Sequence, residues 1–179
     1  MAGLQSVTTP VTLTAISSTT FGIPVANNLT VLANPPLAKM RNSTNQSIPN
    51  TTDTALTWDT EDFDTAGGHS TVSNTSRYTC QSGYAGKYLV RCTVFYAASA
   101  GGTFRDVWFA INGTNVTGSS GRALPASATI LSVTAETIVT LTVGDYVEAF
   151  TRHDSGGALL TATPFARGQS FFEVQWISQ

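Results

Sequence analysis

The chain has 179 residues, which suffice for one domain with an ordinary core and a short appendage and leave little room for a second full domain. Only 11% of the residues are charged, against roughly 25% in an average soluble domain, so hydroxyl and amide side chains dominate the expected surface. A net charge of -2 provides no basic field for a phosphate backbone, and no apolar run is long enough to cross a bilayer, which argues against nucleic acid as a partner and against membrane insertion.

Residues 1–37 differ in composition from the rest of the chain. They are rich in Thr and Ser and end at Asn34-Pro35-Pro36, where two prolines stop any helix and keep the preceding residue extended. One interpretation is a disordered tail, since termini fray unless they are tied down. The segment nevertheless holds more apolar residues than disordered segments usually have, which favours an anchoring arm that docks on another protein. These apolar residues are Val7, Val11, Leu13, Ile16, Phe21, Ile23, Val25, Leu29, Val31 and Leu32.

The amino end and the two cysteines indicate the compartment in which the chain folds. The first basic residue is Lys39, so the basic region that opens a secretory signal is missing. If residues 77–80 and 87–96 pair as a hairpin, Cys92 lies roughly 16 Å from the position opposite Cys80, beyond the reach of a disulfide. We therefore expect two free thiols and folding in a reducing cytoplasm.

Residues 38–179 are expected to form one folded domain made of strands. Short β-prone runs alternate with Gly-rich turn signals, and helix signals are almost absent. The pattern predicts an all-β sandwich or jelly roll without parallel β-α-β units. The expected strands cover residues 55–58, 70–72, 76–80, 87–96, 105–112, 128–133, 137–143, 145–151 and 169–177.

Two of the late strands are apolar on both faces. Because successive side chains of a strand point to opposite sides, Val147 and Ala149 face one way, and Tyr146 and Phe150 face the other. The closing strand likewise carries Phe172, Val174 and Trp176 on one row and Phe171 and Ile177 on the opposite row. A small antiparallel protein usually turns one polar face to water, so the pattern indicates an added cover or self-association.

The densest acidic cluster is Asp59, Glu61, Asp62 and Asp64, followed by His69. Carboxylates at this density could hold Ca²⁺, but the run lacks the spacing and the glycine of an EF-hand. In an extended chain, moreover, two of the acids face away from the other two. We favour capping of turns by these side chains and expect no metal and no cofactor, with Ca²⁺ at residues 59–64 as the open alternative.

His153, Asp154 and Ser155 are the three residue types of a hydrolytic triad. A triad needs side chains brought together from separate elements, and we expect three consecutive residues at a strand end not to point at one another. The chain also has no Gly-x-Ser-x-Gly motif. We therefore expect no catalytic residue and no enzyme activity.

A further group of aromatic and charged residues lies beside Gly-rich loops. Residues 104–109 contain Arg105, Asp106 and Trp108, and Arg122 follows Gly121. Such groups could bind a saccharide or a protein partner. The favoured interpretation is that Trp108 packs inside, while Arg105, Asp106 and Arg122 line a candidate ligand or partner rim.

The order of the motifs resembles C1q-like domains over about residues 38–178. The similarity is closest to versions found in tail and other virion proteins of phages of actinobacteria and their prophages. The order Gly-x-Tyr, then Gly-Asp-Tyr-Val, is its most informative part. The motifs are Ser47-Ile48-Pro49-Asn50-Thr51-Thr52, Leu56-Thr57-Trp58-Asp59, Glu61-Asp62-Phe63-Asp64, Gly68-His69-Ser70, Tyr78, Gly86-Lys87-Tyr88, Arg105, Val143-Gly144-Asp145-Tyr146-Val147 and the closing aromatic strand.

The resemblance implies a ten-stranded C1q/TNF-like jelly roll that assembles as a homotrimer and has a structural or binding role. In such a trimer, the inner sheet is expected to present one face, with Tyr146, Phe150 and Phe171, to the neighbouring subunits. Its other face is expected to fill the core of its own sandwich, with Val147, Ala149, Phe172, Val174 and Trp176. The sequence has no collagen stalk and no coiled-coil heptads, which leaves a short arm and a knob.

Several roles agree with these expectations. The first is a minor tail or fibre-tip protein of a phage virion, anchored to neighbouring virion proteins through residues 1–37, whose knob contacts a host glycan or protein. The second is a capsid decoration protein that stabilises the head. The third is a lectin-like bacterial binding module. A hydrolase acting on the host wall has almost no support from the residues.

Overall fold

The computed structural model describes residues 34–127, 129–162 and 168–179, so most of the expected arm lies outside the described residues. The described part contains thirteen strands and no helix. It therefore contains no helix long and apolar enough to span a membrane. The strands are β1 (Leu37–Arg41), β2 (Ser47–Ile48), β3 (Thr54–Ala55), β4 (Thr60–Asp64), β5 (Arg77–Thr79), β6 (Gly86–Tyr96), β7 (Arg105–Ile111), β8 (Thr114–Asn115), β9 (Gly121–Ala123), β10 (Leu131–Leu141), β11 (Tyr146–His153), β12 (Leu159–Leu160) and β13 (Phe171–Ser178).

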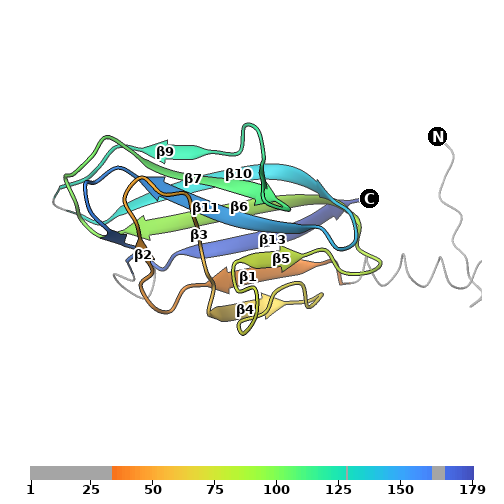
Figure 1. The fold of residues 1–179 in the computed structure, drawn as a ribbon. Coiled ribbons are helices and arrows are strands. Elements are labelled where there is room, and N and C mark those ends of the chain that lie inside the picture. Colours follow the sequence, from red (N-terminus) through yellow and green to blue (C-terminus); the bar gives the residue numbers. More distant parts are fainter. Residues whose placement is uncertain (1–33, 128, 163–167) are drawn as a thin grey trace, which may run out of the picture. The chain divides into compact units, whose positions relative to one another are not determined.

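One layer is a five-stranded antiparallel sheet with the order β10-β6-β13-β1-β4. In Figure 1 these strands follow one another from the top of the view to the bottom. The long strands β6 and β10 pair in register from Gly86↔Leu141 to Tyr96↔Leu131. β13, the last strand of the domain, lies between β6 and β1 and pairs with both of them.

The second layer is a six-stranded sheet centred on β11 and β7, which pair from Val147↔Ile111 to His153↔Arg105. The short strands β3 and β5 pair with the side of β11 that faces away from β7. In the same way, β8 and β9 pair with the side of β7 that faces away from β11. A left-handed turn at Asn112 (φ 50°) and Gly113 (φ 79°) joins β7 to β8, as the Asn-Gly pair predicts. A separate pair, β2 and β12, completes the strands.

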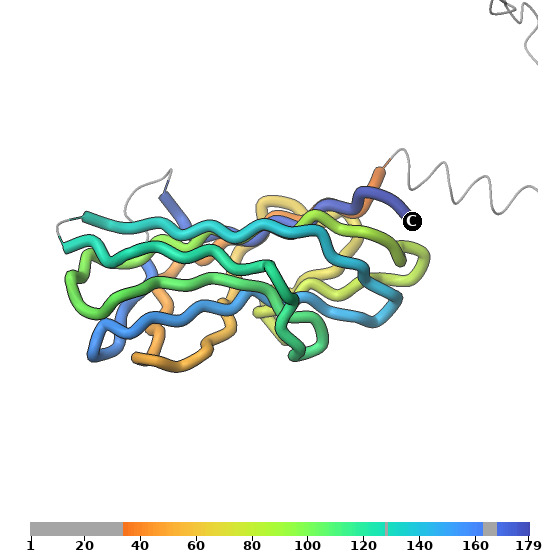
Figure 2. The backbone as a smooth tube through the Cα atoms, turned by 90° about the horizontal axis from the view of Figure 1, so that it is seen from above, coloured from red at the N-terminus to blue at the C-terminus, as the bar shows by residue number. Residues whose placement is uncertain are grey.

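The core lies between these two layers. Alternate residues of β6 and β10 point inward from the five-stranded sheet, and Val107, Phe109, Val147 and Ala149 point inward from the six-stranded sheet. Phe109 meets Phe172 of β13 across the interior, with ring centroids 5.8 Å apart. Figure 2, seen from above, shows β10 in one layer and β11 in the other.

The close approach of β9 to β10 depends on a glycine. A Cβ at Gly121 of β9 would overlap the carbonyl oxygen of Thr134 in β10. Only glycine allows this approach without a backbone shift. β9 therefore closes the sandwich beside β10, although its hydrogen-bonded partner is β7.

Several sequence predictions hold and others need correction. The all-β class and strands near residues 76–80, 87–96, 105–112, 145–151 and 169–177 are confirmed. The two strands expected at 128–133 and 137–143 are one strand, β10, because Ala135 continues the buried row through the polar residues between them. The expected strand at 70–72 is a bend instead. The described residues form thirteen strands rather than ten, and four of the thirteen are only two residues long.

The sandwich begins before residue 38. The backbone N–H of Trp176 donates to the carbonyl of Pro36, and Leu37 already belongs to β1. Pro36 and Leu37 are thus held against β13 in the five-stranded sheet. Cys80 and Cys92 are both buried free thiols, as predicted.

Candidate functional site

The outer face of the five-stranded sheet carries a ladder of opposite charges around an aromatic ring. Lys39 and Glu173 lie 3.1 Å apart, and Arg91 approaches Glu136 and Glu173 at 3.9 and 4.0 Å. The cationic groups of Lys39 and Arg91 lie 5.1 and 5.6 Å from the ring centroid of Phe171. The Phe171 ring is therefore held between two cations, in the middle of this face.

The same face carries exposed apolar side chains, and no described residue covers them. Ile138 of β10 is 59% exposed and lies directly opposite the half-buried Leu89 of β6. Phe95 is half-buried at the far end of β6, and Ile177 of β13 is 45% exposed. Exposed apolar groups gathered on a flat sheet mark an interaction surface. We call these residues, with Phe171, the sheet-face patch.

The outer face of the six-stranded sheet carries a second aromatic group, which we call the aromatic strip: Tyr146, Phe150 and Trp108. Phe150 of β11 lies directly opposite Trp108 of β7, and their rings are nearly parallel (22°) with centroids 5.9 Å apart. The Trp108 indole N–H donates to Asn115 Oδ1 at 2.9 Å, which fixes the orientation of the ring. Tyr146 lies four residues from Phe150 on the same row, under the guanidinium of Arg77 at 3.9 Å.

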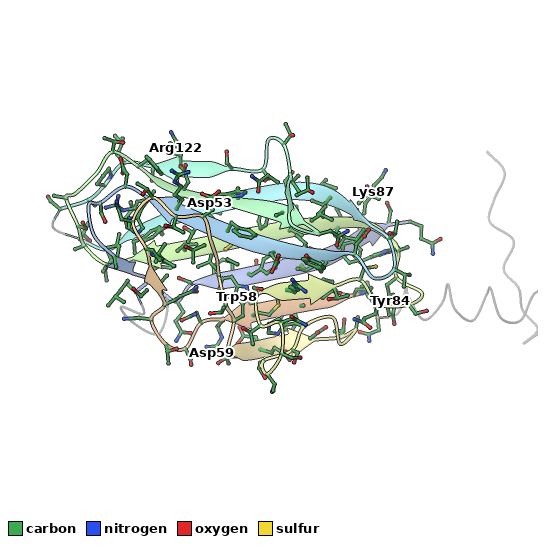
Figure 3. The ribbon with its side chains drawn as sticks, viewed as in Figure 1. Asp53, Trp58, Asp59, Tyr84, Lys87 and Arg122 are labelled. Atoms are coloured by element: carbon green, nitrogen blue, oxygen red, sulfur yellow. The ribbon has the colours of Figure 1, made fainter. Side chains whose placement is uncertain are left out.

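Three ion pairs surround the aromatic strip. Glu148 accepts from Ser76 Oγ at 2.6 Å and from Arg77 Nε at 3.3 Å, so it is satisfied although nearly buried. Arg152 pairs with Asp53 at 3.3 Å, and Arg122 pairs with Asp106 through two bonds of 2.6 Å. In Figure 3, Asp53 and Arg122 lie toward the left of the view, with Lys87 at its right end.

The expected interface residues do not share one face. Tyr146 and Phe150 belong to β11 in the six-stranded sheet, whereas Phe171 belongs to β13 in the five-stranded sheet. The single-face assignment is wrong because the alternation within a strand does not tell which sheet the strand joins. Of the row assigned to the core, Val147, Ala149, Phe172 and Val174 are buried as expected, whereas Trp176 is only partly buried and packs against the core.

The expected rim is also dispersed, because Arg105 is buried. Its side chain is only 1% exposed and donates to the carbonyls of Phe104 (2.8 Å) and Gly101 (2.9 Å). Arg105 has the same parity as the buried Val107 and Phe109, so it points inward with them. Asp106 and Arg122 point outward but bind each other, and the Arg122 guanidinium lies over the Phe104 ring at 4.7 Å.

Trp108 shows the opposite error to Arg105: a residue expected inside lies outside. It was expected to pack inside, yet its parity is opposite to that of Val107 and Phe109, and it is half-buried on the outer face. The alternation of residues in β7 could have predicted that Trp108 faces outward. Its pairing with Phe150 could not have been predicted, since the register between β7 and β11 is not visible in the sequence.

The acidic residues 59–64 act as caps and ion-pair partners. Partial burial works to raise the pKa of Asp59, but hydrogen bonds from Ser43, Thr60 and Thr44 outweigh it and lower that pKa. Asp64 accepts three backbone N–H groups, of Ala66, Gly67 and His69.

The remaining two acids, Glu61 and Asp62, each contact a basic side chain elsewhere in the chain. Glu61 lies 2.7 Å from His69 Nδ1, and Asp62 lies 2.5 Å from Arg41. Across residues 34–127, 129–162 and 168–179, no cluster of three or more His, Cys, Asp or Glu side chains is arranged to hold a metal ion. Asp59 and Asp64 thus accept turn N–H groups, as expected of caps, whereas Glu61 and Asp62 pair with His69 and Arg41.

His153 and Ser155 contact each other, contrary to the expectation for consecutive residues. Ser155 Oγ lies 3.0 Å from Nδ1 of His153, whose Nε2 lies 2.9 Å from the carbonyl of Ile48. Asp154 instead binds the backbone N–H and hydroxyl of Thr103. The imidazole is completely buried and is held from both sides by Ile48 and Ser155, so the contact ties the end of β11 to β2.

Among the hollows that described residues line, two lie near these surfaces. The larger, about 430 Å³, lies where β6 begins and β10 ends and is lined mainly by small and apolar residues, among them Gly86, Leu141 and Val143. The smaller, about 220 Å³, is lined by polar residues around His69 and Arg77. Neither hollow includes a residue of the sheet-face patch or of the aromatic strip.

Comparison with known proteins establishes the fold. No protein-family model matches the sequence, and no curated protein matches it either. Among solved structures, the globular domain of zebrafish complement 1qA is similar, with a TM-score of 0.55, 15% identity, and coverage of 80% of this chain and 98% of that one.

Two further structures have the same fold. Murine APRIL, in a crystal structure at pH 5.0, matches with a TM-score of 0.55, 16% identity, and coverage of 78% and 98%. Eiger TNF from S. frugiperda matches with a TM-score of 0.54, 15% identity, and coverage of 80% and 94%. The chain therefore has a C1q/TNF-like jelly-roll fold, which confirms that part of the resemblance.

Proposed function

We propose that this chain is a non-enzymatic structural protein of a phage virion, displayed as a homotrimeric knob and anchored through residues 1–37. The observation that carries the proposal is the sheet-face patch on a C1q/TNF-like fold. The virion assignment is supported by the order of the sequence motifs, from Ser47-Ile48-Pro49 to Gly144-Asp145-Tyr146-Val147.

Self-association through the sheet-face patch follows from its chemistry. Ile138 and Leu89 form a cross-strand apolar pair on a sheet that would otherwise be solvated on this side. Burial of apolar surface contributes about 25 cal/mol per Å², so covering this face with another copy would favour association. The Lys39–Glu173 and Arg91–Glu136 pairs beside it carry both signs of charge, which gives each copy complementary groups to offer its neighbours.

In the virion, the knob acts as a minor tail or fibre-tip protein that aids attachment to the host. Residues 1–37 bind neighbouring virion proteins, and the outward surface of the knob contacts a host glycan or protein. Capsid decoration is the alternative position for the same assembly. A lectin-like role outside a virion is favoured by a separate observation, the aromatic strip.

Two measurements test the proposal. Native mass spectrometry of the purified full chain at micromolar concentration should give three times the chain mass of 18.8 kDa. A single-chain mass at that concentration would contradict the homotrimer. Cryo-electron microscopy of virions, with antibody labelling of this chain, should place it at the tail tip; label on the head would favour decoration, and unlabelled virions would contradict the virion role.

A further inference from the structure

We infer that the aromatic strip on the outer face of the six-stranded sheet binds a neutral oligosaccharide. The inference rests on the attachment role in the proposed function, and it names the chemistry of the receptor and the surface that recognises it. It does not depend on whether the chain lies on a tail or a head.

The geometry of the strip suits the apolar face of a sugar ring. Phe150 and Trp108 are direct cross-strand neighbours with nearly parallel rings, and both are half-buried on the outside of the sheet. Asn115 holds the Trp108 indole through its N–H, so little side-chain freedom is lost when a ligand binds. Tyr146 lies four residues before Phe150 in β11, about 13 Å away, with one face of its ring covered by Arg77, so Phe150 and Trp108 are the rings open to a sugar.

Polar groups lie where the hydroxyl edge of a sugar would reach. Arg152 and Asp106 are the next pair on the same face after Phe150 and Trp108, and they lie directly opposite each other. Their partners Asp53 and Arg122 extend this polar rim outward. A guanidinium donates two parallel hydrogen bonds and a carboxylate accepts two, and each arrangement matches a pair of neighbouring sugar hydroxyl groups.

The charges around the strip favour a neutral ligand. Three cations, Arg77, Arg152 and Arg122, are matched by three carboxylates, Glu148, Asp53 and Asp106. The pairs cancel locally, so the strip has no net positive field to hold a sulfated, phosphorylated or uronic acid polymer. A neutral, polyhydroxylated chain gains stacking and hydrogen bonds without needing such a field.

The same pattern argues against a protein partner on this face. The centres of protein interfaces are depleted of charged residues. Here the buried carboxylate of Glu148 lies between Tyr146 and Phe150 along β11, and Arg152 follows directly. The aromatic rings are therefore separated by charged groups rather than joined into one apolar patch, unlike the sheet-face patch on the other sheet.

The test is isothermal titration calorimetry of the full chain with neutral pentasaccharides of glucose and of N-acetylglucosamine, and with an oligogalacturonate of equal length as the anionic comparator. Wild-type protein should bind at least one neutral saccharide. Trp108→Ala and Phe150→Leu should each weaken that binding by about tenfold or more, since each removes one aromatic contact. The matched control is Phe63→Ala, which removes an exposed aromatic ring from β4 of the other sheet.

The outcomes are distinguishable from those of the proposed function. Thermal unfolding of each variant checks that it is folded, and Phe150→Leu keeps an apolar side chain in case Trp108→Ala does not fold. Any one of three results would overturn the inference. These are no binding of the wild type to any neutral saccharide, binding by the strip variants as tight as that of the wild type, or a preference of the wild type for the oligogalacturonate. Trimer mass and virion location are measured separately, so a failure here leaves the structural role standing.

Discussion

Tyr146 and Phe171 lie on opposite outer faces of the sandwich, and each ring packs beneath a cationic side chain. The guanidinium of Arg77 lies 3.9 Å from the Tyr146 centroid, and the ammonium of Lys39 lies 5.1 Å from the Phe171 centroid. Cation–π contacts of this kind stabilise by about 0.5–1 kcal/mol at exposed sites. Because one face belongs to each sheet, substitutions can perturb the two surfaces independently.

Ile138→Lys should dissociate the proposed trimer, because it places a charge in the sheet-face patch, where burial of that charge is costly. The matched control is Val143→Lys: Val143 is 56% exposed, close to the 59% of Ile138, but lies beyond the end of β10. Sedimentation equilibrium should show monomers for Ile138→Lys alone.

Tyr146→Lys separates the sequence prediction from the structural assignment in the same experiment. If association uses the five-stranded sheet, this variant stays trimeric, because Tyr146 lies on β11 of the other sheet. Trimers that persist in Ile138→Lys but dissociate in Tyr146→Lys would restore Tyr146 to the interface.

Phe172→Ala should destabilise the protomer strongly. Phe172 is completely buried and stacks on Phe109 at 5.8 Å and near Trp58 at 6.0 Å, so its removal leaves a cavity between the sheets. Loss of a buried Phe costs about 3–5 kcal/mol. Urea unfolding should show a loss of this size, whereas Phe63→Ala at an exposed position should change stability by less than about 0.5 kcal/mol.

Arg105→Met and Arg122→Met should differ sharply. The first variant leaves the partly buried carbonyls of Phe104 and Gly101 without the donor that the buried Arg105 side chain supplies, which costs about 2–4 kcal/mol. The second removes a side chain that is 66% exposed, and we expect no measurable change in stability. Similar unfolding midpoints for the two variants would contradict the burial of Arg105.

Asp154 should contribute to the acid sensitivity of the domain. A hydrogen bond from the Thr103 hydroxyl, together with the backbone N–H groups of Phe104 and Thr103, lowers the pKa of Asp154 from 3.8 to about 2. Since the folded-state pKa is the lower one, this stabilisation is present above the ordinary value and is lost as the pH falls toward about 2.

Asp154→Asn is therefore expected to unfold at a lower temperature at pH 7 and to depend less on pH between pH 4 and pH 2 than the wild type. Thermal unfolding followed by circular dichroism measures both effects. Asp53→Asn, which also replaces a surface aspartate by asparagine but removes only an exposed ion-pair partner of Arg152, is the matched control.

The strand content of the fold could be predicted because it depends on local alternation. In β6, Val90, Cys92 and Val94 alternate with Arg91 and Thr93, and in β11 both rows carry apolar residues; each pattern is readable without knowledge of the fold. The Asn112-Gly113 turn is equally local. The same alternation also held information that we misassigned, since Arg105 shares the inward parity of Phe109, and Trp108 does not.

The candidate sites depend on which strands become neighbours. The aromatic strip exists because β11 pairs with β7 in a register that sets Phe150 opposite Trp108, 42 residues earlier in the chain. The sheet-face patch exists because β13 inserts between β1 and β6 and brings Phe171 beside Lys39 and Arg91.

By itself, the sequence determined that this chain is an all-β protein of low charge whose late strands have two apolar faces. Only the tertiary structure decided that Tyr146 and Phe171 lie on opposite faces, and that Arg105 fills the interior while Trp108 does not. The physical reason is that side-chain alternation is a property of one extended segment. The sheet that a strand joins, in contrast, is decided by hydrogen bonds to strands far away in the chain and by the core that both sheets bury between them.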